Sequence, residues 1–110
     1  MANKYFRQAL IPTAATETTM YTVPEANSAI IRSLRVTNTT GTSSNITVSV
    51  YVNGIGTGNV LQKTRAVGPY STFDVFNGIP GIMEATDVLK VLSSGSDIHF
   101  YLSYLEVDRN

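Results

Sequence analysis

The feature that most constrains the fold of this chain is the alternation of apolar and polar side chains in short runs. The clearest run covers residues 46–52, in which every second side chain is apolar and β-branched: Ile46, Val48, Val50 and Val52. A period of two places successive side chains on opposite faces of a strand, so the run predicts a strand with one buried face. β-Branched side chains also fit a pleated sheet better than a helix.

Comparable runs recur along the chain between turn residues. We expect strands over residues 20–23, 29–38, 46–52, 60–67, 71–76, 82–83, 87–92 and 98–107. About seven or eight strands at a spacing of roughly ten residues, without a helical period, are typical of a sandwich or small barrel. We therefore predict an all-β fold, a single antiparallel β-sandwich of jelly-roll type over residues 20–110.

Two of these runs carry more detailed expectations. In residues 29–38, the apolar side chains Ile30, Leu34 and Val36 share one parity, and the pair Ile31 and Arg32 disturbs it. An extra residue of this kind predicts a β-bulge. In residues 71–76, we expect Phe73 and Val75 on one face of the strand and Thr72, Asp74 and Phe76 on the other.

The first nineteen residues show neither a period of two nor one of 3.6. They mix the aromatic side chains Tyr5 and Phe6 with the basic side chains Lys4 and Arg7. Segments that are too short to fold alone become ordered by lying on another surface. We predict an extended N-terminal arm over residues 1–19, which lies either on its own sandwich or on a neighbouring subunit.

Length and charge narrow the classes of partner. A chain of 110 residues suits one domain, and its eight basic residues balance its eight acidic ones. Without a field of either sign, we expect no specific binding to nucleic acid and no membrane partner. Residues 1–10 contain no apolar signal segment and no run is long enough to span a bilayer, so we expect synthesis in the cytoplasm.

Residues that could carry chemistry are few and scattered. The chain has one histidine, His99, which we expect beside Tyr101 and Ser103 on the outer face of the last strand, and it has no cysteine. A metal site or a nucleophilic site needs several such groups together. The carboxylates are single, and Asp74 and Asp87 stand near strand starts, where we expect them to accept backbone N–H bonds or to lie in solvent. We therefore predict no catalytic residue, no cofactor, no metal and no enzyme activity.

Several segments together resemble a known class of proteins. They are residues 21–24 (YTVP), 29–38 (AIIRSLRVTN), 46–50 (ITVSV), 87–91 (DVLKV) and 99–105 (HFYLSYL). In this order they resemble small virion structural proteins of tailed bacteriophages, over residues 20 to 107. The resemblance implies a role in assembly, in which such proteins decorate or cement the capsid or join head, neck, tail and fibre parts. It implies no catalytic residues and no cofactors.

The resulting hypothesis is a virion protein, made in the cytoplasm of a host bacterium, that binds the capsid surface and neighbouring copies as a decoration or cement protein. We expect a homo-oligomer, a trimer, that also contacts the major capsid protein or other virion proteins. Seven residues are predicted to contact these partners: Lys4, Tyr5, Phe6 and Arg7 in the arm, and Ile55, Tyr70 and Ile79 in loops. Two alternatives stay open, namely a neck, tail or fibre accessory protein and a carbohydrate-binding module that uses exposed tyrosines.

Overall fold

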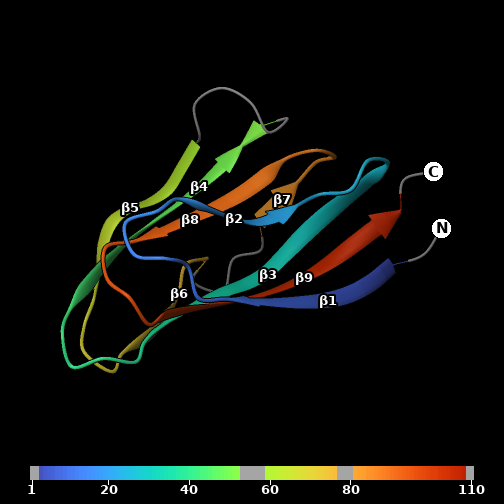
Figure 1. Cartoon of the computed structure of the whole chain (residues 1–110). Coiled ribbons are helices and arrows are strands. Elements are labelled where there is room, and N and C mark those ends of the chain that lie inside the picture. Colours follow the sequence, from blue (N-terminus) through green and yellow to red (C-terminus); the bar gives the residue numbers. More distant parts are fainter. Residues whose placement is uncertain (1–2, 53–58, 77–80, 109–110) are drawn as a thin grey trace.

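The chain forms two antiparallel sheets that pack face to face (Figure 1). The structure is a computed structural model, and it describes residues 3–52, 59–76 and 81–108. Within these residues the strands are β1 (Asn3–Leu10), β2 (Thr18–Thr22), β3 (Asn27–Asn38), β4 (Ser44–Tyr51), β5 (Asn59–Val67), β6 (Thr72–Asp74), β7 (Gly81–Met83), β8 (Val88–Ser93) and β9 (Ile98–Asp108).

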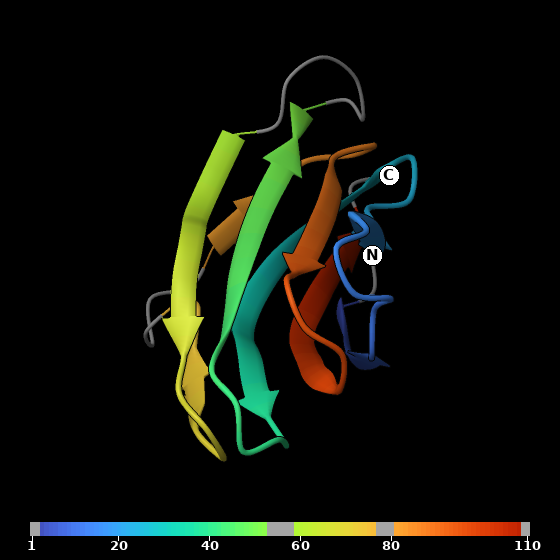
Figure 2. The ribbon, with the colours of Figure 1, turned by 60° about the vertical axis from the view of Figure 1, so that its left-hand side comes forward.

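The order of the strands is that of a jelly roll. The five-stranded sheet has the order β1-β9-β3-β6, with β7 also pairing with β3, and the four-stranded sheet has the order β2-β8-β4-β5. Strand β6 pairs with residues 35–37 and β7 with residues 29–31, so both lie along the same side of β3 as two pieces of one strand. Counted in this way, the described residues form the eight strands in two sheets that a jelly roll requires. Figure 2 shows β4 and β5 of one layer in front of β3 of the other.

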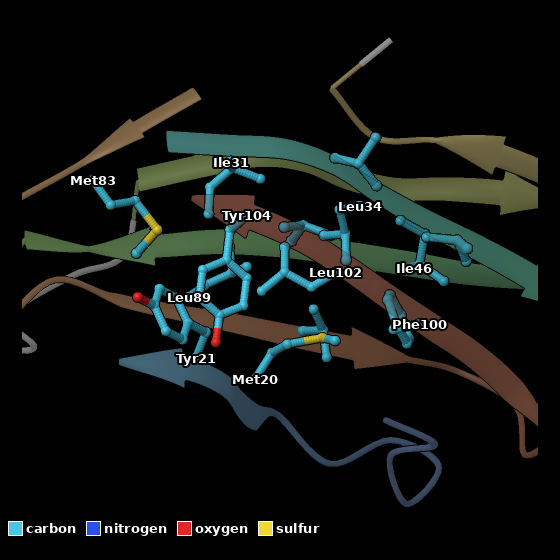
Figure 3. Close-up of a cluster of buried hydrophobic side chains, with 14 of the residues drawn as sticks. Met20, Tyr21, Ile31, Leu34, Ile46, Met83, Leu89, Phe100, Leu102 and Tyr104 are labelled. Carbon is cyan, nitrogen blue, oxygen red and sulfur yellow. The ribbon is translucent and has the colours of Figure 1, made fainter. Parts of the chain in front are cut away.

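The core lies between the two sheets, where the inward side chains of both meet (Figure 3). In β4, Ile46 and Val48 are buried and Val50 packs against the core, as the alternation predicts. Val52 lies beyond the end of β4 and is 53% exposed, so the buried row ends one position earlier than expected. The largest fully buried side chains come from both layers: Ile31, Leu34, Ile46, Leu89, Ile98, Phe100 and Leu102. The predicted all-β sandwich is confirmed. The two sheets pack because their facing apolar rows are thereby removed from water.

The predicted bulge in β3 is also present. The register of β3 against β9 shifts between Ile31 and Ser33, which leaves Arg32 as the extra residue. The shift changes the parity of the inward positions, so Ile31 is fully buried before the bulge and Leu34 after it. The expectation that Ile30 shares the face of Leu34 and Val36 is therefore wrong, because the bulge turns Ile30 to the opposite side of the sheet.

The strand expected over residues 71–76 ends at Asp74, and the backbone N–H of Val75 still donates to the carbonyl of Leu34 at 2.8 Å. One oxygen of Asp74, Oδ1, accepts hydrogen bonds from the backbone N–H groups of Leu34 (3.1 Å) and Phe76 (3.0 Å). The turn that follows brings Phe76 back against the core, contrary to the face predicted for it. Its ring lies so close to the chain that a Cβ on Gly81 would come within 2.7 Å of Cε1.

Asp87 confirms the same expectation for carboxylates at strand starts. Its Oδ2 accepts a hydrogen bond from the backbone N–H of Glu84 at 3.0 Å, and its side chain is buried. The carboxylate thus supplies the acceptor for a backbone N–H in the turn between β7 and β8.

Residues 3–10, for which the sequence pattern predicts no regular strand, form β1. All eight residues pair with β9, from Asn3 opposite Val107 to Leu10 opposite Phe100. The sequence left open whether this stretch lies on its own sandwich or on a neighbouring subunit, and the structure shows it on its own sandwich. The alternation is missing because residues 4–9 are all exposed. Backbone hydrogen bonds to β9 are the main attachment of the strand, and Phe6 and Leu10 add side-chain contacts on its inner side.

One buried amide, that of Asn38, organises the loop that joins the two sheets after β3. Its Nδ2 donates to the carbonyl oxygens of Thr42 (2.8 Å) and Val67 (3.1 Å). Its Oδ1 accepts hydrogen bonds from the backbone N–H (2.9 Å) and the hydroxyl (2.7 Å) of Thr40. The side chain is fully buried and thereby ties the loop to the end of β5.

We predict that Asn38→Ala lowers the free energy of unfolding by about 2–3 kcal/mol, because buried backbone groups lose their partners. Urea denaturation measures the change. Asn45→Ala is the matched control, since Asn45 is exposed, and it is expected to change stability by less than about 0.5 kcal/mol. Equal losses in the two variants would contradict the role given to Asn38.

Candidate contact surface

The four predicted contact residues of the N-terminal stretch, Lys4 to Arg7, all lie on β1 and are exposed. Their side chains do not share one face. Tyr5 and Arg7 lie opposite Leu105 and Ser103 on the outer face of the sheet, and Tyr5 is 73% exposed. That these residues contact a partner stays a prediction.

Phe6 points to the inner side, where a chain of aromatic rings holds β1 to the core. Its ring stacks on that of Tyr104 with 5.6 Å between centroids, and Tyr104 lies 4.2 Å from the ring of Tyr21. The hydroxyl of Tyr21 donates a hydrogen bond of 2.5 Å to Oε2 of Glu106. Asn27 Nδ2 donates to the other carboxylate oxygen of Glu106 at 3.4 Å.

The electrostatics of this cluster favour neutral tyrosines. Burial, and then the hydrogen bond and charge of the Glu106 carboxylate, raise the pKa of Tyr21 far above its ordinary value of about 10. Burial, followed by the charge of Glu106, also raises the pKa of Tyr104. The two hydroxyls therefore stay protonated in the folded chain at pH values where an exposed tyrosine ionises.

We predict that the free energy of unfolding falls as the pH rises above about 10, and that Tyr21→Phe flattens this fall. Tyr21 ionises near pH 10 in the unfolded chain but at a higher pH in the folded chain. Its contribution is complete below pH 10 and is lost above it, because the unfolded state releases the proton first. Urea denaturation between about pH 8 and 11 measures the slope. Tyr70→Phe, in an exposed side chain, is the control, and equal flattening in both variants would contradict the assignment.

The outer face of the five-stranded sheet carries a row of apolar side chains that crosses four strands. Tyr5 on β1 pairs with Leu105 on β9, Leu105 pairs with Ile30 on β3, and Ile30 pairs with Ile82 on β7. Directly paired residues lie on the same face of a sheet, so the four side chains are neighbours. We call them the apolar row.

The apolar row lies at the surface along its whole length. Tyr5 and Ile82 at its two ends are 73% and 74% exposed, whereas Leu105 and Ile30 between them are half-buried. Contiguous exposed apolar side chains mark a site of contact with another molecule. Three of the four residues were not among the predicted contacts, because their adjacency depends on the strand order and on the bulge at Arg32.

Of the predicted loop contacts, Tyr70 does not join this surface. Tyr70 is 75% exposed, but its backbone N–H donates to the carbonyl of Thr40, at the end of β3 that lies away from Ile30. Ile55 and Ile79 lie outside the described residues. The structure therefore places Tyr5 and Ile82 on one face of the five-stranded sheet, at its opposite edges, and leaves Tyr70 outside this row.

On the outer face of the four-stranded sheet, the polar side chains around Tyr51 interact with one another. The hydroxyl of Tyr51 donates to both carboxylate oxygens of Glu17 at 3.0 and 3.1 Å, and Lys90 Nζ lies 4.4 Å from the centre of its ring. The hydrogen bond to Glu17 is the main cause that raises the pKa of Tyr51. These groups are bound to one another, which makes this face a poorer candidate for apolar contact.

His99 lies on the outer face with Tyr101, as expected, and both are exposed. In the part of the chain that the structure describes, no group of three or more His, Cys, Asp or Glu side chains is placed to hold a metal ion. The described residues also contain no helix long and apolar enough to cross a membrane.

Comparison with known proteins bears on the fold. No family model matches the sequence, and no curated protein matches it at a significant level. Among solved structures, the chain is similar to one in the structure of infectious bursal disease virus, Gx strain, with a TM-score of 0.54 and 11% identity over 94% of this chain and 32% of that one. A chain of the T13 particle of the same virus gives a TM-score of 0.40 and 12% identity, over 94% of this chain and 30% of that one.

The chain thus spans about a third of the length of the viral chains it matches. At this identity the first likeness supports a shared jelly-roll fold and no more. Neither match is to a tailed bacteriophage, so the resemblance to that class stays a prediction.

Proposed function

We propose that this chain is a structural protein of a virion, which packs against further copies of itself and against the shell as a decoration or cement protein. The observation that carries the proposal is the apolar row, an exposed apolar surface that crosses the five-stranded sheet from β1 to β7. The fold likeness to a chain of a virus particle supports the same class of function.

Size and charge are compatible with this mechanism. A stable contact buries roughly 800 Å² on each partner, and the broad faces of a molecule that measures 47 × 27 × 21 Å are large enough to supply it. The formal net charge is zero and only 15% of the residues are charged, so copies do not repel one another as a whole. Burial of apolar surface would drive assembly, and we propose a trimer as the assembled unit.

The position in the virion is tested by counting copies. In purified particles, quantitative mass spectrometry of this chain against the major shell protein is expected to give on the order of hundreds of copies, spread over a shell with many equivalent sites. A count of roughly six or twelve would instead favour the alternative position in the neck, tail or fibre, where copies follow the symmetry of the tail. Absence from the particles would contradict the virion role altogether.

We predict that Tyr5→Ser weakens occupancy of the particle and that Tyr70→Ser does not. The two tyrosines are equally exposed, at 73% and 75%, but only Tyr5 belongs to the apolar row. Loss of a buried aromatic contact costs about 2 kcal/mol or more, which is roughly a thirty-fold weaker association. Quantitative re-binding of purified variants to particles that lack the protein measures it. Equal occupancy by both variants would contradict a role of the apolar row in binding to the particle.

A further inference from the structure

In the described part of the chain, three of the four sheet edges have a form that discourages the addition of a further strand. The four-stranded sheet ends at β2 and β5, and the five-stranded sheet ends at β1 and at β6 with β7. The pairing of β2 with β8 contains a register shift, and that of β5 with β4 contains two. Strands β6 and β7 have three residues each. Bulges and short strands protect an edge from unspecific pairing.

Strand β1 lacks these features. Its eight residues, Asn3–Leu10, pair with β9 without a register shift and contain neither proline nor glycine. Among the described residues, no strand pairs with the other side of β1, which lies at the margin of the molecule (Figure 1). Alternate backbone N–H and C=O groups of an edge strand point away from its one neighbour, so β1 presents a regular row of them to the outside.

An aromatic side chain lies partly uncovered at this edge. The ring of Phe6 stacks on that of Tyr104 from β9 and is still 41% exposed. Phe6 lies in the middle of β1, so a strand added to the edge would place a side chain directly beside the exposed part of the ring. The edge thus offers backbone groups and apolar surface to the same partner.

We propose that β1 of one copy pairs with β1 of a second copy, antiparallel, about a two-fold axis at Phe6. The two five-stranded sheets then form one continuous sheet. A two-fold axis normal to the sheet keeps the outer faces of both copies on the same side, and each copy contributes the same residues to the contact. Main-chain hydrogen bonds supply affinity in such strand addition, and the facing side chains supply specificity.

The sequence of β1 selects this register among the alternatives. Directly paired residues lie on the same face, so the axis passes between one residue and its own copy. An axis at Phe6 pairs residues 3–9 of the two copies and an axis at Arg7 pairs residues 4–10, whereas any other axis pairs fewer residues. An axis at Arg7 places two guanidinium groups directly opposite each other, which is destabilising. Only the axis at Phe6 combines the longer pairing with no such repulsion.

The axis at Phe6 also gives the exposed side chains of β1 compatible partners. The two Phe6 rings lie opposite each other and cover their exposed parts. Tyr5 lies opposite Arg7 of the other copy, and a guanidinium group over an aromatic ring is a favourable contact. Lys4 lies opposite the uncharged Gln8. Basic side chains on an edge strand discourage pairing in general, but in this register neither basic residue directly faces another.

The inference goes beyond the proposed function, because it rests on the strand edge and not on the virion role. Pairing takes place in the plane of the sheet, so it leaves the outer face with the apolar row accessible to the shell or to other copies. A two-fold contact does not close a trimer. In the proposed assembly it therefore joins one trimer to the next.

The register is tested by cysteine substitution in the full chain, which has no cysteine of its own. In Phe6→Cys the two thiols face each other with about 4.5–5.5 Å between Cα atoms, within the range of a disulfide. Mild oxidation is expected to give a cross-linked dimer on a non-reducing gel. Gln8→Cys is the matched control, because Gln8 is exposed on the same side of β1 but lies four residues away from its own copy, beyond the reach of a disulfide.

A second test leaves Phe6 in place. Gln8→Glu places a carboxylate opposite Lys4 on both sides of the axis and is expected to tighten self-association about three-fold or more. Gln8→Lys places like charges there and is expected to weaken it by a similar factor. Sedimentation velocity measures the dissociation constant. Asn45→Glu and Asn45→Lys, at an exposed residue of β4 in the other sheet, change the net charge equally and are expected to leave it unchanged.

Three outcomes would overturn the inference: a native chain that stays monomeric at millimolar concentration, equal cross-linking of the Phe6 and Gln8 cysteine variants, or a change of the same sign in the two charged Gln8 variants. Circular dichroism confirms that each variant keeps its β-structure. A chain that dimerises through β1 but is absent from particles would contradict the virion role and leave the pairing intact. A chain found in particles whose Gln8 variants associate equally would contradict the pairing alone.

Discussion

The pairing of β3 with β9 is the interaction on which the rest of the structure depends. The two strands are the longest in the described chain and pair over most of their length, in the middle of the five-stranded sheet. Their register decides which side chains face the core, and the bulge at Arg32 changes that assignment half-way along β3. Without the bulge, Ile31 and Leu34 would not both point inward.

The same register creates the outer surface. Because the bulge turns Ile30 outward, that side chain joins Leu105 on β9, and the apolar row becomes continuous from β1 to β7. A single extra residue thus serves two purposes. It completes the inner packing at Ile31, and it places an apolar side chain where neighbours on both sides are apolar too.

Polar groups in the interior fix the parts of the chain that apolar packing leaves undefined. Asn38 holds the loop after β3, Asp74 ends β6, and Asp87 satisfies the turn before β8. Each of these side chains accepts hydrogen bonds from backbone groups or donates hydrogen bonds to them. The backbone groups would otherwise be buried without partners. The neighbouring rings of Phe6, Tyr104 and Tyr21 attach β1 to the core, although β1 is an exposed edge strand.

The sequence by itself determined the class of fold, since alternating β-branched side chains in runs such as residues 46–52 are a local signal that needs no knowledge of neighbours. It also predicted the bulge near Arg32 and the acceptance of backbone hydrogen bonds by Asp74 and Asp87, although the donor Leu34 of Asp74 and the β9 partner of the bulge are far away in the chain. The strand β1 carried no such signal, because most of its side chains are exposed and pairing with β9 supplies most of its contacts. The apolar row was decided by the tertiary structure alone. Tyr5 and Ile82 are far apart in the chain, and only the order of the strands and their register bring them onto one face, so no pattern within a single segment could reveal them.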